Sequence, residues 1–214
     1  MLDGQRVADG TNHCYGLAFV LLAYAHASMA GVEAARAWIG ETFDLMEHHF
    51  WSSTHGLYAD EATPDWSVVS SYRGQNANMH ACEALLAAFD ATGDTRYLHR
   101  AEILAHNITV RQAGLADGLI WEHYRADWSV DWDYNRNDSS NLFRPWGFQP
   151  GHLAEWAKLL LTKPYPQPAA IQNVYELDVA KDPKMASVGP LEPWDLHYLR
   201  EIDDSGFIDA LYGL

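Results

Sequence analysis

Apolar residues recur at helical spacing in five stretches of the chain. In the first stretch, Leu17, Leu21 and Tyr24 follow one another at intervals of three or four residues, which is typical of one face of an α-helix. Glycines such as Gly31 and Gly93 interrupt the pattern between stretches, as they often do at helix ends. The pattern predicts helices over residues 13–30, 32–50, 75–91, 95–112 and 150–162.

These helices belong to an internal repeat. Gly56-Leu57 matches Gly118-Leu119, and Asp65-Trp-Ser-Val68 matches Asp127-Trp-Ser-Val130, both at an offset of 62 residues. The repeated unit is two helices followed by a long loop, and we expect its Asp-Trp pair to pin the loop to the helices. Such units stack into a solenoid or close into an α/α toroid. Either fold is all-α, and a closed toroid gathers the starts of its inner helices around one cavity.

The repeat ends near Lys163. Residues 1–162 are therefore predicted to form the α/α toroid, here an incomplete one. Residues 163–214 are predicted to form an atypical C-terminal segment, because their composition is acidic with scattered Pro and Gly and the polar signature of the repeat does not return.

A polar signature marks the start of two of the predicted helices. His80 stands three residues before Glu83, and His152 stands three residues before Glu155. Residues three apart share one face of a helix, so each His is expected beside its Glu. Di-metal bundles use the reverse order, Glu-x-x-His, together with further inward Glu residues. We therefore expect no metal, and we interpret the two pairs as the rim of an active site.

Composition and charge exclude several classes of function. The 214 residues carry a net charge of −15 and no basic cluster, which argues against nucleic acid or an anionic membrane as partner. The longest apolar run, residues 17–30, is interrupted by His26 and is too short to span a bilayer. Neither an apolar signal core nor a Cys pair at redox or metal spacing is present, so a cytoplasmic protein is predicted. No Gly-rich nucleotide-binding loop appears, and no cofactor is expected.

Two segments resemble a known family. Tyr72-Arg-Gly-Gln-Asn-Ala-Asn-Met-His-Ala-Cys-Glu83 and Phe143-Arg-Pro-Trp-Gly-Phe-Gln-Pro-Gly-His-Leu-Ala-Glu-Trp156 are similar to motifs of the N-acylglucosamine 2-epimerase family, which includes mannose isomerases and cellobiose 2-epimerases. The resemblance covers residues 11–162. It implies an (α/α)6 barrel whose cavity binds a monosaccharide or disaccharide, and it suggests a homodimer. Family members are about twice the length of this chain.

The resemblance also implies roles for individual residues. His152 would be the catalytic acid/base, and Glu155 would hold and polarise its ring. His80 and Asn76 would contact the sugar, while Arg144 and Tyr15 would line the same pocket. The family's second catalytic His has His197 as its only candidate in the C-terminal segment, and the residues around His197 do not match the family pattern.

Aromatic side chains add two candidates for the pocket. Nine Trp are present, and flat rings of this kind can fill a core or stack on a ligand. Among them Trp146 and Trp51 are the candidates for contact with a sugar ring.

The function expected from these residues is proton transfer on a sugar. A neutral His with a pKa near the working pH can remove the proton at C2 and return one at C1, through an enediol. The Phe-Arg-Pro-Trp entry and the Arg-Gly-Gln-Asn-Ala-Asn-Met-His segment resemble mannose isomerases most, which implies isomerisation of D-mannose to D-fructose. The alternatives are a 2-epimerase acting on N-acylglucosamine or cellobiose, and a shortened, non-catalytic remnant that binds carbohydrate or protein.

Overall fold

The computed structural model describes residues 9–138, 140–160 and 204. The chain divides into two units, residues 1–156 and residues 157–214, and the candidate site lies in the first. The predicted C-terminal segment, including His197, lies almost wholly outside the described residues, so the predicted division at residue 162 stays a prediction. No described helix is long and apolar enough to cross a membrane.

The helices occur where the apolar pattern predicts them. The fourth predicted helix differs in one respect: after His106 its last turns widen into a π-helix, Asn107–Gln112, followed by a 3₁₀ turn, Ala113–Leu115. The α-helices are α1 (Cys14–Met29), α2 (Ala35–His49), α3 (Gln75–Thr92), α4 (Thr95–His106) and α5 (Pro150–Leu160).

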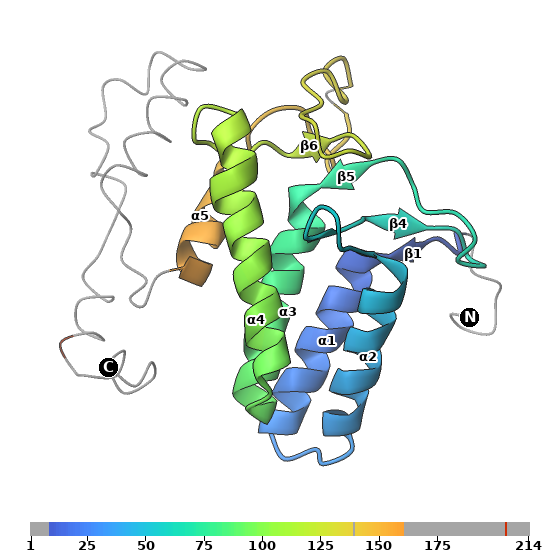
Figure 1. Ribbon diagram of the computed structural model, residues 1–214, viewed down its shortest axis with the longest axis vertical. Coiled ribbons are helices and arrows are strands. Elements are labelled where there is room, and N and C mark those ends of the chain that lie inside the picture. The colour runs from blue at the N-terminus through green and yellow to red at the C-terminus, as the bar shows by residue number, and fades with distance from the viewer. Residues whose placement is uncertain (1–8, 139, 161–203, 205–214) are drawn as a thin grey trace. The chain divides into compact units, whose positions relative to one another are not determined.

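The first four helices form two antiparallel hairpins that lie side by side (Figure 1). Helix α1 packs on α2 and on α3, and α3 packs on α4. The contact between α1 and α3 is close because both helices bury small side chains, such as Ala18 and Ala25 of α1 and Ala81 and Ala84 of α3, all fully inaccessible to solvent. Helices α1 and α3 therefore run parallel and begin at the same end.

Short antiparallel ladders hold those two helix starts in place. Strand β1 (Asn12–His13) pairs with β4 (Glu61–Ala62), and β5 (Arg73–Gly74) pairs with β6 (His123–Tyr124). A third ladder joins β2 (Trp51–Ser52) to β3 (Leu57–Tyr58). The first two ladders lead directly into α1 and α3, so the loop after each outer helix is tied to the start of an inner helix.

The backbone at the two helix starts repeats as well. The amide of Cys14 donates to the carbonyl of Asp60 at 2.9 Å, and the amide of Gln75 donates to the carbonyl of Glu122 at 3.2 Å. Asp60 and Glu122 are 62 positions apart, the offset found in the sequence. The repeat therefore places an acidic residue beside the start of each inner helix.

The Asp-Trp pairs of the repeat have the predicted structural role. Trp66 and Trp128 adopt φ angles of 62° and 63°, and the preceding Asp of each pair accepts a hydrogen bond from the Ser that follows the Trp. The ring of Trp66 stacks on that of His49 at 3.9 Å between centroids, and Trp128 is 3% exposed. Both side chains thus fix their loops against the helical unit.

The two matching glycines of the repeat offer a stability test. Gly56 has a φ of +64°, and a Cβ there would meet Asn107 Nδ2 at 2.4 Å; Gly118 has a φ of +83° and open space around it. Gly118→Ala should cost only the backbone strain, about 1 kcal/mol. Gly56→Ala should cost roughly 2 kcal/mol more, because Asn107 must also leave the carbonyl of Gly56, to which it donates at 2.8 Å. Urea unfolding of both variants checks this, and equal losses would contradict it.

Candidate active site

His152 lies in the first turn of α5, against a buried carboxylate. Helix α5 begins at Pro150, a residue suited to the first helical position. Nδ1 of His152 is 2.9 Å from Oε2 of Glu122, whose side chain is 5% exposed. Burial disfavours the charged form of the ring, but the hydrogen bond to Glu122 and the charges of Glu122 and Glu155 outweigh it and raise the pKa of His152.

The carboxylate that holds His152 is therefore not the one we expected. Glu155 is exposed and acts on His152 through its charge, whereas Glu122 makes the direct contact. The reason is geometric: Glu122 contacts the ring from the loop residue directly before β6, while Glu155 is exposed to solvent one turn further along α5. The repeat carried a signal for Glu122, because Asp60 occupies the matching position 62 residues earlier.

Two further buried side chains complete the contact behind His152. The amide nitrogen of Gln75, at the start of α3, is 3.0 Å from Oε2 of Glu122 and 2.9 Å from Nδ1 of His152. The indole N–H of Trp156, one turn beyond His152, donates to Oε1 of Gln75 at 2.7 Å. Both Gln75 and Trp156 are at most 1% exposed, so this side of the ring is closed to solvent.

His80 lies on α3 and faces the start of α1. Its Nδ1 is 3.2 Å from Oε2 of Glu83, which confirms that these two residues share a helix face. The ring meets Tyr15 edge-on at 5.2 Å and Phe19 at 4.7 Å between centroids. One turn before His80, Oδ1 of Asn76 is buried without a hydrogen-bond partner among the described residues. This part of the site thus combines aromatic side chains with a buried acceptor that lacks a hydrogen-bond partner among the described residues.

Arg144 is held by three side chains of the loop region. Its guanidinium pairs with Glu61, lies 4.0 Å from the centroid of the Tyr72 ring and is 3.5 Å from the Tyr134 hydroxyl. Burial works against the charge of Arg144, but these partners outweigh it and raise the pKa of Arg144. The guanidinium of Arg144 therefore stays charged, and its three partners fix its orientation.

His123 connects the Arg144 cluster to Glu122, its neighbour in sequence. Nδ1 of His123 is 3.0 Å from the Tyr72 hydroxyl, and Nε2 is 2.8 Å from the carbonyl oxygen of Pro145. A carbonyl can only accept, so Nε2 carries the proton and Nδ1 accepts from Tyr72. Burial lowers the pKa of His123, against the effect of the Pro145 carbonyl. His123 is therefore a neutral structural link.

The two tryptophan candidates lie in different places. Trp146 is 44% exposed and donates its N–H to the carbonyl of Trp132 at 2.6 Å, in the same loop region as Arg144. Trp51 lies elsewhere, because the guanidinium of Arg100 from α4 covers its ring at 3.4 Å. Arg100 also pairs with Glu47 of α2, so Trp51 packs between the outer helices and not against His152.

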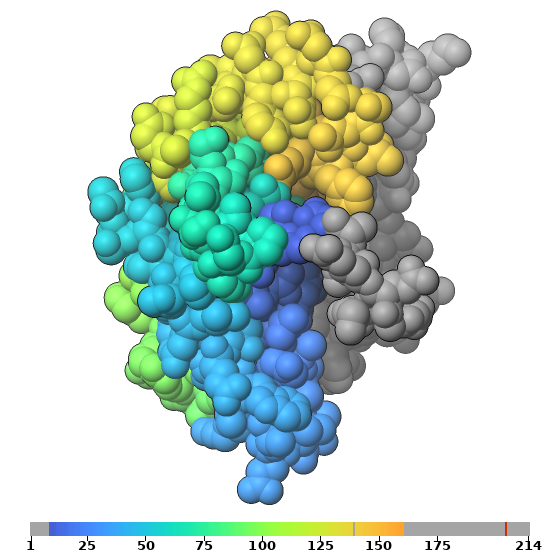
Figure 2. Space-filling view, turned by 90° about the vertical axis from the view of Figure 1, so that its right-hand side faces the viewer, coloured from blue at the N-terminus to red at the C-terminus, as the bar shows by residue number. Residues whose placement is uncertain are grey.

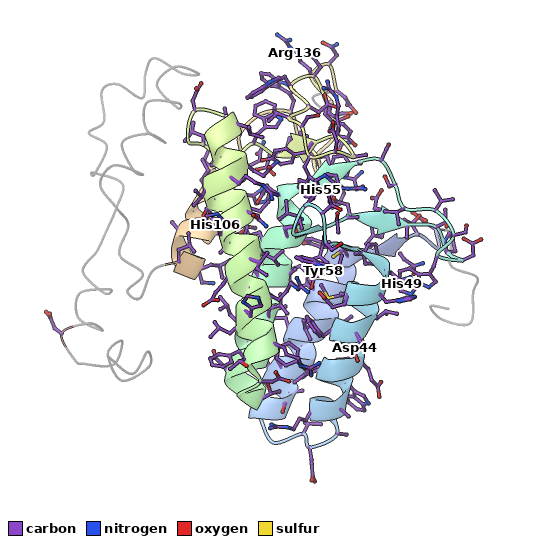
Figure 3. All side chains as sticks on the ribbon, in the orientation of Figure 1. Asp44, His49, His55, Tyr58, His106 and Arg136 are labelled. Atoms are coloured by element: carbon purple, nitrogen blue, oxygen red, sulfur yellow. The ribbon has the colours of Figure 1, made fainter. Side chains whose placement is uncertain are left out.

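Tyr58 belongs to the same group of contacts as Trp51. Its hydroxyl donates to Glu47, and its ring meets that of Trp51 edge-on at 5.1 Å. Figure 3 shows Tyr58 among the helices, far from Arg136, which lies at the outer end of the long loop. The aromatic surface of Trp51 and Tyr58 is thus used to cover a partly buried ion pair.

The remaining candidates gather at one end of the helical unit. Figure 2 shows residues of the long loops (teal and yellow) meeting the starts of α1 (dark blue) and α5 (orange) on one region of the surface. Within the described ranges, no three His, Cys, Asp or Glu side chains are grouped as metal ligands. The arrangement offers a partly exposed His for proton transfer, a fixed cation and an amide oxygen that has no partner among the described residues.

Comparisons with known proteins agree on one family. The family model described as N-acylglucosamine 2-epimerase (GlcNAc 2-epimerase) matches residues 1–181. The chain is 61% identical over 162 residues to a D-mannose isomerase of Marinomonas mediterranea, covering 75% of this chain and 41% of that protein. It is 42% identical over 155 residues to a D-mannose isomerase of Thermobifida fusca, covering 72% and 38%. The chain thus spans about two fifths of the length of these curated relatives.

Solved structures give the same picture for the fold. A crystal structure of D-mannose isomerase superposes with a TM-score of 0.71 at 55% sequence identity, covering 80% of this chain and 45% of that one. Cellobiose 2-epimerase from Spirochaeta thermophila gives a TM-score of 0.61 at 24% identity, covering 83% and 46%. These similarities confirm the predicted all-α fold of the α/α type.

Proposed function

The chain belongs to the N-acylglucosamine 2-epimerase family, and from this premise we propose that it is a sugar isomerase that converts D-mannose to D-fructose. The observation that carries the proposal is His152: a partly exposed imidazole whose far side is held by the buried carboxylate of Glu122. The proposed substrate rests on the two relatives named D-mannose isomerase, which are 61% and 42% identical to this chain.

The proposed reaction moves one carbonyl group by one carbon. His152 removes the proton at C2 of the open-chain aldose; the electrons of the broken C–H bond form the C1=C2 bond of the enediolate, and the C1=O π pair moves onto O1. The proton on O2 passes to O1, and His152 returns a proton to C1, so that the carbonyl is now at C2. One C–H bond breaks and another forms without a net change of electrons, and a base with a raised pKa suits both transfers.

Other residues support the charge that develops on the sugar oxygens. The permanent cation of Arg144 and the ring of His80 are donors of the kind that stabilise an enediolate. Oδ1 of Asn76, which is buried and has no partner in the part of the chain that the structure describes, can accept a hydrogen bond from a sugar hydroxyl. We propose these roles, together with a contact of Tyr15 or Trp146 with the sugar ring, from the position of each side chain beside His80 or Arg144.

The alternative function is 2-epimerisation, in which the proton returns to C2 from the other face. The cellobiose 2-epimerase structure is only 24% identical to this chain and supports the fold alone. Isomerisation is better supported, because the relatives named D-mannose isomerase are 61% and 42% identical. A cytoplasmic location and a homodimer stay predictions.

Proton exchange followed by NMR tests the proposal. The full chain is incubated with D-mannose in D₂O, and deuterium at C1 and C2 is followed over time. We expect D-fructose labelled at C1. In His152→Ala the rate should fall by on the order of 10²–10⁴-fold, the usual contribution of a positioned acid/base, while circular dichroism confirms a folded chain.

Each other outcome identifies a different function. Glucose labelled at C2 would show that the chain acts as an epimerase and not as an isomerase. If the folded chain exchanges no proton of mannose, N-acetylmannosamine or cellobiose, the proposal fails, and a sugar-binding remnant becomes the better description. Full activity in His152→Ala would show that a residue other than His152 is the base.

A further inference from the structure

Three buried side chains behind His152 form a series of hydrogen bonds in which each member donates to the next. Trp156 Nε1 is 2.7 Å from Oε1 of Gln75, Gln75 Nε2 is 3.0 Å from Oε2 of Glu122, and the same Oε2 is 2.9 Å from Nδ1 of His152. Trp156 comes from α5, Gln75 from the start of α3, and Glu122 from the loop directly before β6. Side chains of separate elements thus hold one imidazole nitrogen.

The direction of these hydrogen bonds follows from the chemistry of Trp156. An indole N–H can only donate, so the side-chain oxygen of Gln75 must face Trp156. The amide of Gln75 is then fixed with its NH₂ group toward Glu122, and it cannot turn over without leaving the indole N–H unpaired in a buried place. Such a loss costs about 1–3 kcal/mol.

The proton of neutral His152 can then be placed. If it is on Nδ1, the carboxylate of Glu122 accepts two hydrogen bonds, one from Gln75 and one from His152. If it is on Nε2, Nδ1 can accept from the Gln75 amide nitrogen at 2.9 Å, but its lone pair also faces a buried carboxylate oxygen at 2.9 Å, and Glu122 keeps only the donor of Gln75. The second arrangement is unfavourable because Oε1 of Glu122 is also buried, with no hydrogen-bond partner among the described residues.

We propose that Trp156, Gln75 and Glu122 are positioning residues that keep the proton of neutral His152 on Nδ1 and leave Nε2 as the nitrogen that exchanges protons with the sugar. The inference deepens the proposed function, because it rests on His152 being the base. It also fixes the side from which substrate approaches: C2 must lie in front of Nε2, away from Gln75.

NMR of the full chain labelled with ¹⁵N at histidine tests the proton position directly and without sugar. Long-range proton–nitrogen correlations distinguish a protonated from an unprotonated ring nitrogen, and His152→Ala identifies the signals of His152. At a pH above the pKa of His152 we expect Nδ1 to carry the proton. In Glu122→Ala we expect the proton to move largely to Nε2, because the carboxylate acceptor is lost and the Gln75 amide nitrogen, 2.9 Å from Nδ1, can then donate to it.

Activity gives a second readout for the same variants. Proton exchange in Glu122→Ala should fall by on the order of 10⁴-fold, the loss seen when the orienting carboxylate of a serine protease is removed. Any remaining activity should extend to lower pH, because Glu122 raises the pKa of His152. Trp156→Phe keeps an apolar ring but frees the Gln75 amide, and we expect a mixture of both proton positions.

Glu155→Gln is the matched control, because the groups whose charges act on His152 are Glu122 and Glu155. This variant should lower the pKa of His152 and leave the proton on Nδ1. A wild-type ring with its proton on Nε2, or an unchanged proton position in both Glu122→Ala and Trp156→Phe, would overturn the inference. If Glu122→Ala does not fold, the result for Trp156→Phe is the test. Absence of exchange with every sugar would refute the proposed function but leave the NMR result valid.

Discussion

Asn78→Leu is expected to lower the free energy of unfolding by about 3–5 kcal/mol, the largest single effect on stability that we foresee. Asn78 is fully buried in α3. It accepts from the amide of Tyr58 at 2.8 Å and donates to the carbonyls of Tyr58 and Gly74 at 3.0 and 3.2 Å. Leucine fills the same volume but leaves these buried backbone groups unpaired, at about 1–3 kcal/mol each.

Urea unfolding monitored by tryptophan fluorescence measures this loss. Asn137→Leu is the control, because Asn137 is exposed in the long loop and its replacement should change stability by less than about 0.5 kcal/mol. Similar results for the two variants would mean that the loop around Tyr58 can move away from α3 at little cost.

Asp60→Asn is expected to change the pH dependence of stability. Burial raises the pKa of Asp60 to about 8, against the hydrogen bond from the Gly74 amide and the charges of Arg144 and Arg73. The folded chain therefore holds one proton more than the unfolded chain between the ordinary carboxyl pKa and about 8. The contribution of Asp60 to the free energy of unfolding is therefore fully present below the ordinary carboxyl pKa, and it is lost as the pH rises from there to about 8.

Asparagine removes this proton uptake and keeps an acceptor for the Gly74 amide, which lies 2.7 Å from Oδ2 of Asp60. Between pH 5 and pH 8 the wild-type chain should therefore lose at least ~2 kcal/mol more stability than Asp60→Asn, since one pKa unit corresponds to about 1.4 kcal/mol. Denaturant unfolding at several pH values measures the difference.

The control for this series is Asp65→Asn. Asp65 is exposed, and hydrogen bonds from Thr63 and Ser67 lower its pKa to about 2. It is ionised in both states above pH 5, so its replacement should shift the stability curve without changing its slope there. Parallel curves for the wild-type chain and Asp60→Asn would show that Asp60 is ionised in the folded state.

The helices of this fold could be predicted from the sequence because their signals are local. Apolar residues at intervals of three and four, together with glycines such as Gly31 and Gly93, locate α1 to α4 within a few residues. The two-residue ladders could not be located in this way, because two residues contain no period. Their positions depend on contacts between loops that are about 50 residues apart in sequence.

The site was predicted only as far as its residues follow one another along a helix. His80 and Glu83 contact each other as their spacing predicts. Glu122 was missed because its contact with His152 joins a loop to a helix, and no spacing rule describes such a pair. Trp51 was misplaced for a related reason: an aromatic residue in a sequence does not reveal that Arg100, 49 positions later, will cover its ring.

The common end at which the inner helices begin has a practical consequence for protein engineering. The turns at Gly31 and Gly93 join α1 to α2 and α3 to α4 at the opposite end of the hairpins (Figure 1). Both glycines have open space where a side chain would be, and exposed turns accept inserted sequence. Reporter groups, affinity tags or surface attachment points introduced there would be separated from His152 by the length of a helix.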